Sequence, residues 1–169
     1  MPIAKGLTSG YIPMGGVVVR DEIVQTLNEG GEFYHGFTYS GHPVAAAVAL
    51  ENIRILREEK IVEKVKAETA PYLQQRWQEL ADHPLVGEAR GVGMVAALEL
   101  VKNKQTRERF AGGVGMLCRE HCFRNGLIMR AVGDTMIISP PLVISKDEVD
   151  ELVTKARKCL DLTLAEVKG

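Results

Sequence analysis

Three short segments of the sequence contain residues that could do chemistry, and the first surrounds a lysine. Lys5 lies among the small residues of segment 4–11, Ala-Lys-Gly-Leu-Thr-Ser-Gly-Tyr, with Pro13-Met14-Gly15 following. Small neighbours let a planar group approach the amine. An amine in a tight, partly dry pocket has a lowered pKa and can form a Schiff base with an aldehyde. A solvated lysine beside a glycine turn is the alternative interpretation.

The second segment covers residues 35–43, His-Gly-Phe-Thr-Tyr-Ser-Gly-His-Pro, and leads into an expected helix. The first turn of a helix has backbone N–H groups without partners, and the helix dipole adds positive potential there. Together with the hydroxyl groups of the segment, these donors would suit a phosphate. A plain helix cap is the alternative, and the segment alone favours it.

The third candidate is Arg130, on an expected strand before the Gly133-Asp134 turn. Its planar guanidinium could bind a carboxylate through two parallel hydrogen bonds. An arginine on the exposed face of an edge strand is the alternative. Cys118 and Cys122, four residues apart beside His121, make a poor zinc site without a second pair of ligands, so we expect buried thiols and no metal.

The elements that must position these residues differ along the chain. Residues 1–41 hold almost half of the 17 glycines and predict loops, a strand over 16–19 and a short helix over 21–28 that is capped by Asp21. Pro43 opens a long helix that continues through residues 45–57. Residues 44–50 are apolar on all sides, which predicts burial all round.

The second part of the chain has an irregular alternation of strands and helices. A helix over residues 71–82 places Tyr72 and Trp77 in a core. Ser145 caps a last helix that reaches about residue 166. A further helix covers residues 114–124, and the expected strands cover residues 86–90, 94–101, 127–132 and 135–139. This order predicts a small antiparallel sheet with helices on one face.

Composition excludes several classes of protein. The 169 residues include 21 Lys+Arg and 22 Asp+Glu, so the formal net charge of −1 gives no basic surface for nucleic acid. The longest apolar stretches, 44–50 and 136–144, are too short or too interrupted by proline to cross a membrane. Three cysteines do not fit a disulfide framework, and no signal-peptide core begins the chain, so we expect a cytoplasmic protein.

Taken together, segments 4–15 and 35–43 and Arg130 ahead of Pro140-Pro141 resemble the class III aminotransferases. The resemblance is greatest to the ω-transaminases that act on β-alanine, ω-amino acids or simple amines with pyruvate as acceptor. It implies an α/β fold, that of the fold-type I transferases dependent on pyridoxal 5'-phosphate (PLP). The chain would be a C-terminal fragment, with residues 1–68 a strip of the large PLP domain and residues 69–169 a small α+β sandwich domain with an antiparallel sheet.

The resemblance also implies roles for individual residues. Lys5 would be the catalytic residue, which forms the Schiff base with PLP and then carries the proton between substrate and cofactor. Thr38 and the backbone around Phe37 would bind the cofactor phosphate across the interface of a homodimer or larger homo-oligomer. Arg130 would bind the substrate carboxylate. The partners would be a small amine or amino acid and a keto acid.

The family's other cofactor-binding residues precede its lysine, and this sequence does not contain them. We therefore expect the isolated chain to be inactive, with activity belonging to the intact protein. The alternative is a non-catalytic α+β module for interaction or oligomerisation, in which residues 70–169 fold alone.

Overall fold

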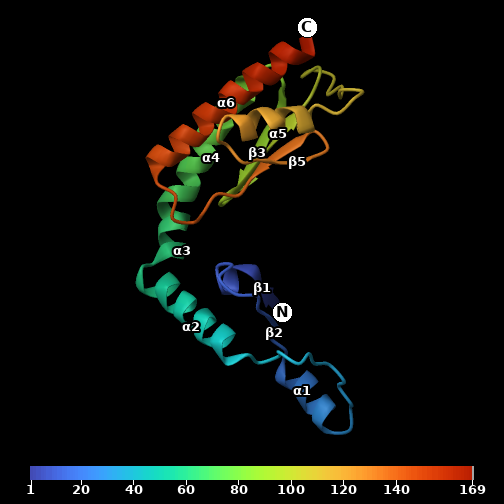
Figure 1. Ribbon diagram of the computed structural model, residues 1–169, viewed down its shortest axis with the longest axis vertical. Coiled ribbons are helices and arrows are strands. Elements are labelled where there is room, and N and C mark those ends of the chain that lie inside the picture. The colour runs from blue at the N-terminus through green and yellow to red at the C-terminus, as the bar shows by residue number, and fades with distance from the viewer. Residues whose placement is uncertain (169) are drawn as a thin grey trace. The chain divides into compact units, whose positions relative to one another are not determined.

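The computed structural model describes residues 1–168, which divide into two compact units. The first unit runs from Met1 to Lys60, and the second begins at Ile61 (Figure 1). The boundary predicted from the sequence, between residues 68 and 69, lies inside a helical stretch of the second unit and stays a prediction. None of the described helices is both long and apolar enough to cross a membrane.

The first unit consists of a two-stranded hairpin and two helices. Strand β1 (Pro2–Ala4) pairs antiparallel with β2 (Gly15–Val17), and Ile3 faces Gly16. A turn of 3₁₀-helix, Lys5–Leu7, follows β1 directly. The ladder therefore closes a loop whose first residue is Lys5.

Helix α1 (Asp21–Asn28) has the bounds that the sequence predicts, but its cap differs. Arg20, not Asp21, occupies the N-cap position, and no side chain caps the helix there. Asp21 lies in the first turn, where its negative charge still interacts favourably with the helix dipole. The prediction of Asp21 as the cap is wrong because the helical backbone begins at Asp21 itself.

Helix α2 (Pro43–Glu58) begins at Pro43, as predicted, because proline fits the first position of a helix. The His42 Nδ1 atom accepts a hydrogen bond from the Val44 N–H at 3.2 Å. Only Ala45 and Ala49 are buried, whereas Val44 and Leu50 are 56% and 69% exposed. The prediction that residues 44–50 are buried all round is therefore wrong for this chain, because α2 packs chiefly on the Lys5–Leu7 turn, which covers only one stripe of the helix.

The second unit opens with continuous helical turns, from α3 (Ile61–Lys64) through a π-helical turn (Val65–Thr69) to α4 (Ala70–Gln78) and a 3₁₀ turn (Glu79–Asp82). In the wide turn the Ala70 N–H donates to the Val65 carbonyl, five residues back. Pro71 follows, and a proline ring clashes with the carbonyl four residues before it and supplies no N–H. The local widening relieves that conflict.

A four-stranded antiparallel sheet forms the centre of the second unit. Its order is β3-β4-β6-β5. The strands are β3 (Val86–Val92), β4 (Val95–Leu100), β5 (Arg130–Val132) and β6 (Thr135–Ile138). Helices α4 and α5 (Gly115–Arg124) pack against the strands, and α6 (Lys146–Lys168) packs on these two helices on the same side of the sheet (Figure 1), which confirms the predicted architecture.

The core of the second unit lies between this sheet and the helices. Leu98 of β4 and Met136 of β6 are buried and face each other in the ladder. Trp77 is only 1% exposed, and its indole N–H donates to the Ala97 carbonyl at 3.1 Å. Tyr72 lies at the margin of the core, and its hydroxyl donates to Asp150 of α6 at 2.8 Å.

The predicted cap of α6 is confirmed by a reciprocal pair of hydrogen bonds. The Ser145 hydroxyl accepts from the Glu148 N–H at 3.2 Å, and the Glu148 carboxylate accepts from the Ser145 N–H at 2.8 Å. These bonds satisfy two backbone donors that the helix itself leaves without partners.

His83 ends the 3₁₀ turn and is 3% exposed. The Leu85 N–H donates to its Nδ1 atom at 3.2 Å, so the proton of the neutral ring belongs on Nε2, which lies 3.2 Å from Asp161 Oδ1. Burial holds the pKa of His83 below its ordinary value, and Asp161 opposes this shift. A second ring proton would displace the Leu85 N–H.

We expect the free energy of unfolding to fall as the pH drops from about 7 through the lowered folded pKa of His83. The folded pKa is below the unfolded value, so this contribution is present above about pH 6.5 and is lost as the pH falls through the folded pKa. Urea denaturation at several pH values measures it. The carboxylates with lowered pKa values, Glu51, Asp82, Glu148 and Asp150, titrate below this window.

His83→Asn provides the control, since the asparagine oxygen can still accept from Leu85 but does not titrate. The variant should lose most of the pH dependence in this window. An unchanged slope in His83→Asn would contradict the assignment.

Candidate active site

Lys5 occupies an unusual backbone conformation at the start of the loop that the hairpin closes. Its φ is 55°, and that of Ser9 is 49°. Both values are left-handed, a region that residues other than glycine adopt at a cost of about 1–3 kcal/mol and only where surrounding contacts impose it. Such residues concentrate at functional sites, so the geometry strengthens Lys5 as a candidate.

Hydrogen bonds within the loop contribute to this conformation. The Thr8 N–H donates to the Lys5 carbonyl at 3.3 Å. The Thr8 side chain is buried, and its hydroxyl donates to the Ile12 carbonyl at 2.7 Å. Hydrogen bonds within the loop therefore stabilise the backbone between Lys5 and Ile12.

The loop encloses a small hollow of about 200 Å³. Its lining consists of Lys5, Thr8, Gly10, Ile12, Pro13 and Met14. The small residues Thr8, Gly10 and Pro13 lie beside Lys5 in this hollow together with the larger Ile12 and Met14, and the predicted role of Lys5 stays a prediction.

The second candidate segment forms a tight turn just before α2. The Ser40 N–H donates to the Phe37 carbonyl, and the Phe37 N–H donates to the Ser40 hydroxyl, both at 2.9 Å. Phe37 is 76% exposed, and Thr38 is exposed in the middle of the turn. The Thr38 hydroxyl has no partner among residues 1–168, whereas the Phe37 N–H is already used within the turn.

The structure brings the two N-terminal segments together. A second hollow, of about 280 Å³, is lined on one side by Pro13, Met14 and Gly15 and on the other by the turn and the start of α2. The residues of the second side are Phe37, Tyr39, Ser40, Gly41, His42, Ala45 and Ala46. Pro13 and Met14 thus separate this hollow from that of Lys5, so Lys5 and Thr38 do not line one cavity in this chain.

Arg130 is the first residue of β5, one of the two edge strands of the four-stranded sheet, and is exposed. Its ladder partner is Ile137, which faces Ala97, which in turn faces Arg90. This row lies on the face of the sheet opposite the buried row through Met136. Arg130 makes no ion pair within the described part of the chain, so its guanidinium is available for a carboxylate.

Asp134, in the turn between β5 and β6, fixes the Arg130 hairpin to α5. Its Oδ1 atom accepts from the Val114 and Gly115 N–H groups at 2.7 and 3.0 Å. A Cβ atom on Gly115 would lie 2.0 Å from the Gly133 carbonyl oxygen, so only glycine permits this approach. The side chain of Asp134 acts as the cap that α5 does not obtain from its own N-cap residue.

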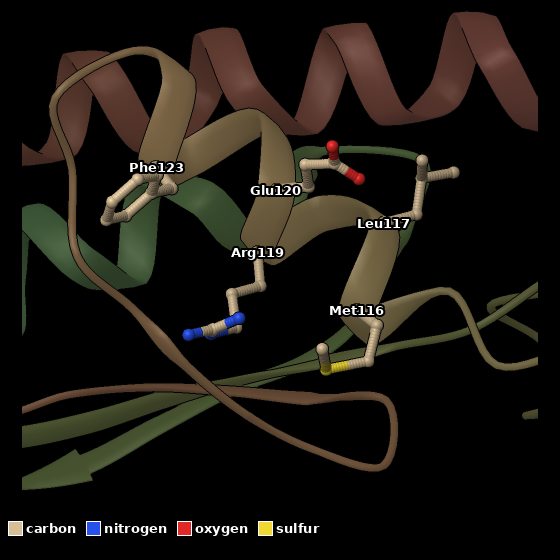
Figure 2. A pocket seen from close by; sticks show the side chains of 5 residues that line it. All are labelled: Met116, Leu117, Arg119, Glu120 and Phe123. Atoms are coloured by element: carbon tan, nitrogen blue, oxygen red, sulfur yellow. The ribbon is translucent and has the colours of Figure 1, made fainter.

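A larger hollow, of about 490 Å³, lies on the outer face of α5. Met116, Leu117, Arg119, Glu120 and Phe123 line it. Figure 2 shows that Arg119 and Met116 leave the helix on one side and Glu120 and Leu117 on another. The two charged side chains of the lining, Arg119 and Glu120, therefore do not converge on one point, as the polar groups of a ligand site do.

The three cysteines are free thiols and are buried, as the sequence predicts. Burial raises the pKa of Cys159, which keeps it in the thiol form. Among residues 1–168, no three His, Cys, Asp or Glu side chains come together in a way that could hold a metal ion.

One polar side chain that the sequence analysis did not single out contacts the Lys5 turn. Asn52 of α2 donates hydrogen bonds to the carbonyls of Gly6 and Leu7. The signal in the sequence was weak but present. Asn52 lies at helical spacing from Ala45 and Ala49, so it is a polar residue on the one stripe of α2 that is buried.

The sequence model of the class-III aminotransferases matches residues 1–160, and the chain belongs to this family. Among relatives, it is 89% identical over 168 residues to putrescine–pyruvate aminotransferase of Pseudomonas aeruginosa, an alignment that covers 99% of this chain and 37% of that protein. It is 41% identical over 176 residues to a probable γ-aminobutyrate transaminase 3, mitochondrial, of Oryza sativa subsp. indica, which covers 99% of this chain and 34% of that protein.

Solved structures agree with the sequence relatives. The PMP-bound form of an aminotransferase from Vibrio fluvialis superposes with a TM-score of 0.91 at 37% identity and covers 98% of this chain and 38% of that one. An (S)-enantioselective ω-transaminase from Thermomicrobium roseum gives 0.90 at 43% identity, covering 96% and 37%. The α/β fold class implied by the resemblance is confirmed. The chain spans about a third of the length of the curated relatives it matches.

We expect Asp134→Ala to lower the free energy of unfolding by about 1–2 kcal/mol, because the N-terminus of α5 loses its cap. Urea denaturation followed by circular dichroism measures the change. Asp134→Asn keeps an acceptor oxygen and should retain most of the stability. Equal losses in the two variants would show that the negative charge, and not the hydrogen-bond geometry, provides the stabilisation.

Proposed function

We propose that this chain is part of a PLP-dependent ω-transaminase that transfers an amino group from an amine or ω-amino acid to a keto acid. The observation that carries the proposal is Lys5, held in a left-handed turn at the mouth of a small hollow, in a chain of the class III family. The name of the relative with 89% identity supports putrescine as amine donor and pyruvate as acceptor.

The residues of the first unit fit PLP at two points. Lys5 offers an amine beside small and apolar neighbours, and the Thr38 hydroxyl is exposed near the start of α2, a helix of 16 residues. When bound, PLP supplies an aldehyde that takes up amines and a ring that accepts electrons. The chain's own residues bind it, orient it and move protons.

Lys5 has two successive tasks in this proposal. Its amine first holds the cofactor covalently and is released when the amine substrate takes its place. The freed ε-amine then accepts a proton from the substrate carbon and returns it at a second position, acting as base and then as acid. A left-handed backbone at Lys5 sets the direction from which the amine approaches.

Thr38 and the N-terminal end of α2 would bind the cofactor phosphate. The hydroxyl donates a hydrogen bond, and the dipole of α2 stabilises negative charge near its first turn. Because Lys5 and Thr38 do not share a cavity within one chain, we propose a homodimer in which Thr38 contacts the phosphate of the cofactor held by a second copy's lysine.

Arg130 would bind the carboxylate of the keto acid, since a free guanidinium matches a carboxylate through two hydrogen bonds. The chain spans about a third of the length of its relatives, so we propose that activity belongs to the intact protein and that the isolated chain is inactive. We also propose a cytoplasmic location, which the three free thiols support.

Lys5→Ala tests the central assignment. We expect the spectrophotometric change on titration with PLP to be lost, because Lys5 is in a left-handed loop position and also lines a small hollow. Lys60→Ala is the matched control, since Lys60 is also exposed with a φ of 51° but lies between helices. Equal absorbance changes in Lys5→Ala and the unsubstituted chain would overturn the role of Lys5.

Arg130→Gln tests substrate recognition in the intact protein. We expect KM for pyruvate to rise about 10- to 100-fold, because a charge-assisted hydrogen-bonded pair is lost. KM for an amine donor that has no carboxylate should stay the same. Arg90→Gln is the control, since Arg90 lies in the same row but is already paired with Glu99 at 3.0 Å. Similar effects of the two substitutions on pyruvate would contradict the assignment.

A further inference from the structure

Asn52 lies in the middle of α2 and is partly buried. It is three residues after Ala49 and seven after Ala45, and helical geometry puts all three on one stripe. The two alanines are buried within the first unit, so this stripe of α2 faces the interior of the unit. A polar side chain at such a position needs partners.

Every polar atom of the Asn52 amide is used on the loop that begins at Lys5. The Nδ2 group donates to the Gly6 carbonyl at 2.9 Å and to the Leu7 carbonyl at 3.1 Å. The Oδ1 atom accepts from the Ser9 hydroxyl at 2.6 Å. An amide has two donors on one nitrogen and an acceptor beside it, which is the combination that these three partners require.

These contacts span the two strained positions of the loop. Lys5 precedes Gly6 directly, and Ser9 is itself left-handed. A left-handed residue other than glycine persists only where its surroundings determine the backbone. The β1/β2 ladder fixes Ala4, on the N-terminal side of Lys5, and Asn52 fixes the two carbonyls on its C-terminal side.

We propose that Asn52 is the positioning residue for Lys5. By holding the peptide groups that follow Lys5, it fixes the left-handed conformation and hence the direction in which the lysine side chain leaves the backbone. Asn52 touches neither the amine nor the hollow beside it, so it acts through the loop. The proposal rests on the proposed role of Lys5 and adds a requirement for an amide at position 52.

Asn52→Asp isolates this requirement. The side chain keeps its size and its acceptor for Ser9, but both donors are replaced by a carboxylate oxygen that faces two carbonyl oxygens. Gln25→Glu is the matched control, since it makes the same amide-to-carboxylate change at an exposed position of α1 in the same unit. Circular dichroism of both variants verifies that the helices are retained.

Amide hydrogen exchange measures the loop directly. The Thr8 and Ser9 N–H groups donate to the Lys5 and Gly6 carbonyls, so they report opening of the turn. In Asn52→Asp we expect their exchange to be faster by about 10- to 100-fold, because two hydrogen bonds are lost, with no change in Gln25→Glu. Unchanged protection in Asn52→Asp would overturn the proposal.

Reductive labelling measures the consequence for the amine. PLP and borohydride are applied across a range of pH, and peptide mapping gives the yield at Lys5 relative to Lys60 in the same chain. We expect this ratio to fall about tenfold in Asn52→Asp and to stay the same in Gln25→Glu, because only the first variant loses the hydrogen bonds that orient Lys5. If Asn52 only stabilised the fold, Asn52→Asp would leave the ratio of labelling at Lys5 to Lys60, and the pH profile of that ratio, unchanged.

The two measurements distinguish a failure of the proposal for Asn52 from a failure of the proposed role of Lys5. If Lys5 is labelled preferentially and equally in every variant, Asn52 does not position it and the proposed function stands. If Lys5 and Lys60 are labelled equally in the unsubstituted chain, the proposed role of Lys5 fails, and amide exchange alone decides whether Asn52 holds the loop.

Discussion

Lys5 has a left-handed backbone conformation that lysine rarely adopts, and contacts from several parts of the first unit stabilise it. The β1/β2 ladder ends at Ala4 and Gly15, which closes the loop on both sides. Thr8 of this loop is buried, and Asn52 connects the loop to α2. A fixed backbone matters for the proposed role of Lys5, because misplacement of a catalytic group by about 1 Å can cost a hundredfold in rate.

In the second unit, the two arginines on the open face of the sheet differ in their ion pairs. Its sheet buries one face under the helices and exposes the other, where Arg90 and Arg130 occupy the same row. Glu88 and Glu99 neutralise Arg90, whereas β5 offers Arg130 no acid. Asp134 holds the hairpin of Arg130 to α5, so the guanidinium is presented from a fixed strand and not from a mobile loop.

Local patterns in the sequence predicted where helices begin better than they predicted how those helices are packed. Pro43 and Ser145 correctly marked the beginnings of α2 and α6, because proline geometry and capping hydrogen bonds act within a few residues. Asp21 was assigned a capping role that the backbone gives to Arg20. The apolar run 44–50 predicted complete burial, but burial depends on neighbouring elements, and the first unit covers only Ala45 and Ala49.

The sequence by itself determined the family, the candidate residues Lys5, Thr38 and Arg130, and the order of helices and strands, because motifs and periodicity are local properties. Only the tertiary structure decided that Lys5 is left-handed, that Asn52 holds its loop and that Asp134 caps α5. These contacts join residues about 20 to 46 positions apart. No local preference encodes such a pair, since it forms only when the intervening chain has folded.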